Sequence, residues 1–259
     1  PATTEADWSC IAWAVDNSLD FLALSFVRRA DEVRALKRRL HDLHHPGSSP
    51  IPVVSKIEKP QAVADLDSII EASDAVMVAR GDLGVEMDIA QVPIVQKQIL
   101  ARCQYFGRPC IVATQMLESM IHAASPTRAE ASDVANAIFD AADAVMLSGE
   151  TAVGKHPALV VETMRRIIAA AESHIASSPH HDSPPQHLIE SRYPTAALAH
   201  GAWHIAKDID AKLIVCWSQA GGTARYLSQN DFHIPIVAYT SDPQTARRMA
   251  LLKGVTPIL

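Results

Sequence analysis

The sequence has few aromatic residues and few cysteines, and both shortages make several classes of protein improbable. Aromatic residues form 5% of the 259 residues and the net charge is −6, so we expect no basic, aromatic-lined surface and no nucleic-acid partner. The four cysteines lie far apart without a CxxC spacing, which favours reduced thiols in a cytoplasmic protein over a disulfide framework or a zinc site. No apolar run is long enough to span a bilayer and no signal peptide is evident, so we expect no membrane association.

The apolar residues that are present indicate an α/β fold. Hydrophobic residues make up 48% of the chain, mostly alanine, valine, isoleucine and leucine, which is typical of parallel sheets covered by helices. Strand-like runs alternate with helical patterns and recur about every 30 residues, as in a (β/α)8 TIM barrel. The runs are Phe21–Phe26, Ile51–Ile57, Ala75–Ala79, Pro109–Thr114 and Ala144–Leu147.

Five such units are too few to close an eight-stranded barrel. We therefore expect residues 1–173 to form an incomplete barrel with the last five βα units, whose first three strands are missing or come from another chain. Because the sequence opens on Pro1 and not on methionine, we also expect it to be part of a longer protein.

The rest of the chain predicts a linker and a second, smaller domain. Residues 174–191 are rich in serine, proline and histidine, a composition typical of linkers. Residues 192–259 show a βαβαβ pattern, with strands expected at Leu213–Trp217 and Ile234–Thr240 and in the closing residues VTPIL. This pattern predicts a truncated three-layer α/β domain.

Two segments of the predicted barrel are near copies of each other. SDAVMVARGD (Ser73–Asp82) and ADAVMLSGE (Ala142–Glu150) share Asp-Ala-Val-Met and then reach glycine and an acid with an offset of one residue. Such internal similarity indicates equivalent strands of one barrel.

Residues that could carry chemistry follow two neighbouring strands. Lys56 and Glu58 point the same way at the end of one predicted strand, because side-chain direction alternates. Asp82 follows the next strand, and Gly81 before it allows close approach of an anion to the backbone. Two carboxylates at adjacent strand ends suit Mg²⁺, although a rim ion pair and a helix cap explain each residue taken alone.

Two further polar segments have a helix-capping interpretation beside a functional one. Thr114 ends a third strand, where it is either a cap for the next helix or a hydroxyl of the site. Ser125–Glu130 predicts a helix start, with Ser125 as the cap, proline in the first turn and an early acid. An interface role for this segment is the alternative.

Five long motifs together resemble one family. SKIEKPQAV, VMVARGDLGVE, IVATQMLESM, PTRAEASDVANAI and DAVMLSGETAVGKHP, in this order and spacing, closely resemble pyruvate kinase. The resemblance implies a (β/α)8 barrel with a C-terminal α/β domain. It also implies phosphoryl transfer from phosphoenolpyruvate to ADP, giving pyruvate and ATP in cytoplasmic glycolysis, with Mg²⁺ or Mn²⁺, K⁺ and a homotetrameric assembly.

The resemblance also implies roles for individual residues. Lys56 looks like the lysine that stabilises the enolate and the transferring phosphoryl group, and Glu58 and Asp82 look like the Mg²⁺ ligands. Gly81 and Asp82 resemble the backbone segment that holds the substrate carboxylate. Thr114 resembles the threonine beside the reacting carbon, where it helps protonation.

The sequence also departs from the family pattern. The three earlier strands of the family carry a phosphate-binding arginine, the K⁺ ligands and a lid domain, none of which is in this sequence, so we expect the 259-residue chain alone to lack full activity. In the loop SQAGGT, Ala220 and Gly222 replace a serine and an arginine of an effector site, which argues against such a site. A noncatalytic binding or interaction module is the alternative function.

Overall fold

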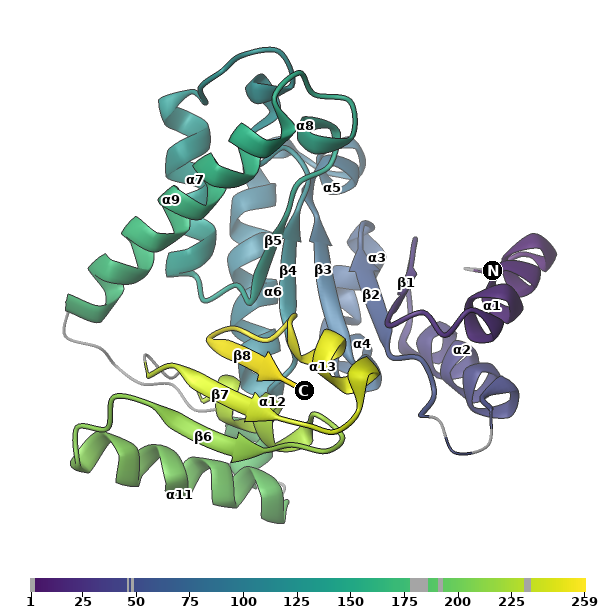
Figure 1. Ribbon diagram of the computed structural model, residues 1–259. Helices are drawn as coiled ribbons and strands as arrows, with labels where there is room; N and C mark the ends of the chain where they lie inside the picture. Colours follow the sequence, from purple (N-terminus) through teal and green to yellow (C-terminus); the bar gives the residue numbers. More distant parts are fainter. Residues whose placement is uncertain (1–2, 46, 48, 178–185, 191–192, 231–233) are drawn as a thin grey trace.

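The computed structural model describes residues 3–45, 47, 49–177, 186–190, 193–230 and 234–259 (Figure 1). The larger part of the chain alternates strands and helices, as the sequence predicts. Its elements are α1 (Glu5–Asp16), β1 (Leu22–Leu24), α2 (Ala30–Leu43), β2 (Val53–Ile57), α3 (Pro60–Ala64), α4 (Leu66–Ala72), β3 (Ala75–Ala79), α5 (Arg80–Glu86), the 3-10 turn η1 (Ile89–Gln91), α6 (Val92–Phe106), β4 (Cys110–Ala113), the 3-10 turn η2 (Glu118–Ile121), α7 (Arg128–Phe139), β5 (Ala144–Met146), α8 (Gly149–Ala152) and α9 (Pro157–Ser177).

The five predicted strands are all present and form one parallel sheet in the order β1-β2-β3-β4-β5. Because side chains alternate along each strand, the sheet has two buried faces. One face packs against the helices, and its core includes Ile57, Val76 and Val112. The other face is lined by Val54, Met77 and Ala113 and corresponds to the interior of a barrel. Within the described residues this sheet has β1 and β5 as its edges, so the incomplete barrel remains a prediction.

The smaller part of the chain contains three parallel strands and their helices. Its strand order is β6-β7-β8. The elements are α10 (Gln186–Glu190), α11 (Pro194–Asp208), β6 (Ile214–Trp217), α12 (Gly222–Ser228), β7 (Ile236–Tyr239), α13 (Pro243–Met249) and β8 (Val255–Ile258).

Helices α11, α12 and α13 lie on one face of this sheet. Cys216 and Ala238 point into clusters formed with α11, α12 and α13. The alternate residues Val215, Trp217 and Tyr239 are exposed, Trp217 at 62%. The described residues therefore form two layers and not the three that the sequence led us to expect.

Two local predictions are adjusted by the structure. Helix α9 extends to Ser177 and α10 occupies 186–190, so both enter the range 174–191 that we predicted as a linker; residues 178–185 and 191–192 lie outside the described residues. Helix α7 is capped by Thr127 and not by Ser125, because the Thr127 hydroxyl and the Glu130 carboxylate exchange the two bonds of a capping box.

The two parts of the chain contact each other through polar side chains. The Gln229 amide donates to Asp143 Oδ1 at 2.9 Å, and Arg247 pairs with Asp20 at 2.8 Å. Figure 1 shows β8 and α13 lying against the amino ends of the larger sheet.

All four cysteines are free thiols. In the described part of the chain, no helix has the length and apolarity needed to cross a membrane.

Candidate functional site

Lys56 and Glu58 form a tight ion pair at the carboxyl end of β2. The Lys56 ammonium lies 2.5 Å from Glu58 Oε1 and donates to Ser25 Oγ at 3.1 Å. Glu58 Oε2 accepts the backbone N–H of Phe26 at 2.6 Å, and the Glu58 side chain is 1% exposed. A buried carboxylate and an ammonium therefore stand side by side at the rim of the sheet, as the strand periodicity predicts.

Gly81 and Thr114 meet at the carboxyl ends of β3 and β4. Thr114 Oγ1 accepts the Gly81 N–H at 2.8 Å and donates to the carbonyl of Ala113 at 2.6 Å. The Gly81 N–H is thus already engaged by the protein. A Cβ at Gly81 would lie 3.4 Å from Thr114 Oγ1, which is ordinary contact, so the protein itself does not need a glycine here.

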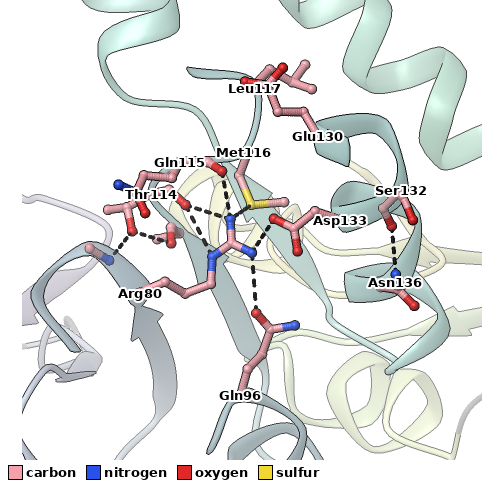
Figure 2. Close-up of polar contacts among 12 residues, drawn as sticks. Arg80, Gln96, Thr114, Gln115, Met116, Leu117, Glu130, Ser132, Asp133 and Asn136 are labelled. Carbon is pink, nitrogen blue, oxygen red and sulfur yellow. Dashed lines mark hydrogen bonds and ion pairs between the residues drawn. The ribbon is translucent and has the colours of Figure 1, made fainter. Parts of the chain in front are cut away.

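Arg80 connects this turn to the helices behind it (Figure 2). Its guanidinium donates to the carbonyl of Thr114 from Nε at 3.2 Å and from Nη2 at 2.7 Å, and to the carbonyl of Gln115 at 3.0 Å. On the other side, Nη1 lies 2.5 Å from Asp133 Oδ2 of α7 and 3.5 Å from Gln96 Oε1 of α6. The charge of this buried arginine is therefore balanced by a carboxylate, as buried ions require.

Two carboxylates hold the segment that follows Thr114. Glu150, fully buried, accepts the backbone N–H of Leu117 at 3.1 Å. Glu130 accepts the N–H of Ser119 at 2.7 Å and two bonds from Thr127. Burial raises the pKa of Glu130, but hydrogen bonds from Ser119 and Thr127 outweigh burial and hold that pKa below its ordinary value. The Glu130 carboxylate is therefore ionised at neutral pH where it binds this segment.

Comparisons with known proteins match both parts of the chain to one family. The family model for the barrel domain of pyruvate kinase matches residues 1–161, and the model for its α/β domain matches residues 196–259. The chain belongs to the pyruvate kinase family. The resemblance stated from the motifs is confirmed.

Individual pyruvate kinases support the same assignment. The chain is 43% identical over 254 residues to the pyruvate kinase of Mycobacterium intracellulare and 43% identical over 258 residues to that of Geobacillus stearothermophilus. These alignments cover 98% of this chain, 52% of the first relative and 43% of the second. A crystal structure of a pyruvate kinase from Cryptosporidium parvum superposes with a TM-score of 0.88 at 37% identity, covering 99% of this chain and 52% of that one. The chain thus spans about half the length of the pyruvate kinases it matches.

Asp82 differs from the other predicted site residues because its side chain is exposed. It lies in the first turn of α5. Among the described residues, no group of three or more histidine, cysteine, aspartate and glutamate side chains is arranged to hold a metal ion. Glu58 and Asp82 are carboxylates, the type of donor that Mg²⁺ takes from proteins, commonly one or two at a time with water and substrate oxygens completing the shell. Their assignment as metal ligands stays a prediction.

The contacts of Arg80 and Asp133 were not predicted from the sequence. Arg80 directly follows a strand whose five residues are all buried, and a charge in that position signals a buried partner. No spacing rule links it to Asp133, which is 53 residues away in the chain. In the small domain, Ser218 Oγ accepts the N–H of Ala224 at 3.1 Å, so the loop SQAGGT is closed by its own hydroxyl.

Proposed function

We propose that this chain contributes the phosphoryl-transfer site of a pyruvate kinase that converts phosphoenolpyruvate and ADP into pyruvate and ATP. The observation that carries the proposal is the Lys56 ammonium held 2.5 Å from the buried Glu58 carboxylate at the carboxyl end of β2. Parallel strands of this fold place their active sites at that end. Gly81 and Asp82 follow β3 and Thr114 follows β4, so the residues to which we assign substrate binding, metal binding and proton handling follow neighbouring strands of one sheet.

The reaction needs positive charge near the phosphoryl oxygens and the enol oxygen of the substrate. When the phosphoryl group moves to ADP, the bond between phosphorus and the enol oxygen breaks, a bond to a terminal ADP oxygen forms, and the enolate keeps the electron pair. The Lys56 ammonium stabilises both the phosphoryl oxygens and the developing enolate oxygen. Carbon 3 of the enolate then takes a proton that solvent supplies, next to Thr114, and pyruvate results.

A divalent cation belongs to this proposal as the resident cofactor. Glu58 and Asp82 would hold Mg²⁺ or Mn²⁺. The ion would act as a Lewis acid toward substrate oxygens. Glu58 is fixed for that role because the Phe26 N–H holds one of its oxygens. We propose K⁺ as a second cofactor from family membership alone, and we assign no residue of this chain to it.

Other properties of the complete protein are proposed on the same basis. We infer a glycolytic enzyme in the cytoplasm that acts as a homotetramer. For the 259-residue chain alone we expect little turnover. Phosphoryl transfer depends on several groups positioned around one phosphate, and each stabilising donor is worth about 10²–10³ in rate.

The test is a lactate-dehydrogenase-coupled assay of the protein expressed from its full reading frame and of the 259-residue chain, side by side. With phosphoenolpyruvate, ADP, Mg²⁺ and K⁺, we expect the full protein to turn over at about 1–100 per second. Lys56→Met should lower kcat by about 10²–10³-fold. Lys97→Met is the matched control, because Lys97 pairs with Asp140 on the surface of α6 and should leave kcat unchanged.

The alternative is a noncatalytic pyruvate-kinase-like module. It predicts no phosphoenolpyruvate-dependent turnover above the Lys56→Met blank in either preparation. Equal rates for the wild-type protein and Lys56→Met would equally remove the proposed role of this lysine.

A further inference from the structure

We propose that Arg80 is a positioning residue that sets the Thr114 hydroxyl in place for the proton-transfer half of the reaction. The inference rests on the proposed function. It assigns to the Arg80–Asp133 pair a purpose beyond tying helices together. Four observations carry it: the backbone conformation of Thr114, the bonds from Arg80 to that backbone, the burial of Arg80 and the bonding of the hydroxyl.

Thr114 and Gln115 have an uncommon backbone conformation. Their φ angles are 67° and 54°, in the left-handed region. A β-branched residue such as threonine is a true outlier there, because its branched Cβ crowds the carbonyl oxygens. Such residues persist only where the surroundings over-determine them, and they cluster at functional sites.

The side chain of Arg80 supplies that restraint. Its guanidinium binds the carbonyls of Thr114 and Gln115, the two residues with positive φ, through three N–H bonds of 2.7–3.2 Å. Figure 2 shows the planar fork between these carbonyls on one side and Asp133 on the other. Two successive carbonyls turned toward one cation cannot relax to an extended strand without losing those bonds. A lysine could bind one carbonyl well but lacks the planar fork.

Arg80 is itself immobilised. The residue is 8% exposed and begins α5 immediately after β3, so its backbone is fixed by the sheet. Asp133 balances its charge from α7, and the Met116 sulfur lies 2.9 Å from Nη2. The restraint on Thr114 is therefore built from the sheet and from α7.

The consequence concerns the Thr114 hydroxyl. A threonine hydroxyl has one proton and two lone pairs. Here the proton goes to the carbonyl of Ala113 at 2.6 Å and one lone pair accepts the N–H of Gly81 at 2.8 Å. One lone pair remains as an acceptor for a water molecule that supplies the proton to carbon 3, and its direction is set by the backbone that Arg80 holds. Misplacement of a group by about 1 Å can cost 10²-fold in rate, so the restraint matters for catalysis.

A purely structural tie makes a different prediction. If Arg80 and Asp133 only hold α5 against α7, their loss lowers stability, and its effect on rate adds independently to that of Thr114. If Arg80 acts through Thr114, its loss has no further effect once the hydroxyl is gone. The two readings therefore differ in a double-mutant cycle.

The experiment compares the wild-type full-length protein with Arg80→Met, Thr114→Ala and the double variant. Two rates are measured: kcat in the coupled assay, and exchange of the pyruvate methyl protons for deuterium in D₂O by NMR, which isolates the protonation step. We expect each single variant to lower both rates by about 10²-fold, with the KM for phosphoenolpyruvate changed by less than about threefold. The double variant should be no slower than the slower single variant.

Two further variants define the specificity of the effect. Arg80→Lys retains the charge and one carbonyl contact. We therefore expect its rate of methyl-proton exchange to lie between the rates of the wild-type protein and Arg80→Met. Arg102→Met is the matched control, since Arg102 makes a bidentate pair with Asp67 at 2.7 Å for both bonds and lies away from the site. It should exchange at the wild-type rate.

Several outcomes overturn the inference. Arg80 has a structural role only if Arg80→Met exchanges methyl protons at the wild-type rate. The same conclusion follows if the fold-loss in rate of the double variant equals the product of the two single fold-losses. Asp133 has a side chain that is 41% exposed, so its carboxylate can be hydrated when the guanidinium is removed, and we expect Arg80→Met to fold. If it does not melt cooperatively, Arg80→Lys replaces it in the same cycle. Absence of turnover in the wild-type protein instead rejects the proposed function.

Discussion

The two near-identical segments Ser73–Asp82 and Ala142–Glu150 begin with the same structural device. In both, the aspartate before the strand accepts the first backbone N–H of the neighbouring strand. Val53 donates to Asp74 at 2.9 Å, and Cys110 donates to Asp143 at 2.8 Å. The repeated aspartate therefore aligns β2 with β3 and β4 with β5, and this part of the repeat belongs to the fold.

The same segments end in different ways. The first reaches its acid through Arg80, one residue more than the second, and its Asp82 is exposed on α5. In the second, Glu150 is 0% exposed and accepts the N–H groups of Leu117 and Ser148. Since one residue corresponds to a rotation of about 100° on a helix, the offset is enough to send one acid to solvent and the other into the core. A shared Gly-acid motif thus yields one candidate ligand and one structural group.

The largest expected effect is a difference between Asp82 and Glu150 in how their loss changes the response of thermal stability to a divalent metal ion. Asp82→Ala should abolish the rise in thermal stability that Mg²⁺ or Mn²⁺ causes, because the ion stabilises only the folded protein that binds it. That rise corresponds to about 2.7 kcal/mol at one hundred times Kd. Turnover of the full-length protein should fall by about 10²-fold or more. Thermal melting with and without Mn²⁺, together with the coupled assay, measures both.

Glu150→Ala is the comparison for this variant and should retain its metal response. A metal-induced shift that survives in Asp82→Ala would remove Asp82 from the ligand set. A shift lost only in Glu150→Ala would reverse the assignment of the two acids.

The second effect is a loss of stability at the other acid. Glu150→Ala leaves the buried N–H of Leu117 and the N–H of Ser148 without an acceptor, which should lower the free energy of unfolding by about 2–4 kcal/mol. Glu150→Gln keeps one acceptor oxygen and should lose less. Urea unfolding at constant m-value measures the difference. A loss below about 0.5 kcal/mol, typical of surface positions, would contradict the structural role of Glu150.

Much of the fold could be predicted because strand period and helix signals are local. The five strands of the larger sheet were located within a few residues, and Gly107 ends α6 in the left-handed conformation expected of a helix stop. The Lys56–Glu58 pair followed from alternation along a single strand. These features depend on neighbours in the chain.

The contacts missed from the sequence depend on distant residues or on competition between equivalent groups. Arg80 meets Asp133 across 53 residues, and no periodicity describes that distance. At the start of α7, Ser125 and Thr127 are both good caps, and Thr127 prevails because Glu130 stands three residues after it and completes the capping box. The difference in exposure between Asp82 and Glu150 likewise could be seen only in the three-dimensional structure.

The smallest effect tests a difference between the two aspartates that precede β3 and β5: Asp74 pairs with Lys37 of the larger part of the chain. Asp143 accepts a bond from Gln229 of the small domain. Burial raises its pKa to about 6 from 3.8, against the opposing influence of the Cys110 N–H, Lys253 and Gln229. Because the folded state then binds a proton that the unfolded state releases, stability contributed by Asp143 rises as pH falls from about 7 to about 4.

The measurement for Asp143 is the difference in Tm between the wild-type protein and Asp143→Asn across that pH range. Asparagine does not titrate, so the wild-type Tm should gain on that of the variant as the pH falls, by a few degrees, since about 1 kcal/mol shifts Tm by 2–4 °C in a chain of this size. Gln229→Leu removes a bond that favours the ionised carboxylate, so the gain should begin at higher pH. A Tm difference that is independent of pH, or that grows as pH rises, would show that Asp143 is ionised in the folded protein down to the ordinary carboxylate range. The stability contributed by the contact between Asp143 and Gln229 would then not increase as the pH falls from about 7 to about 4.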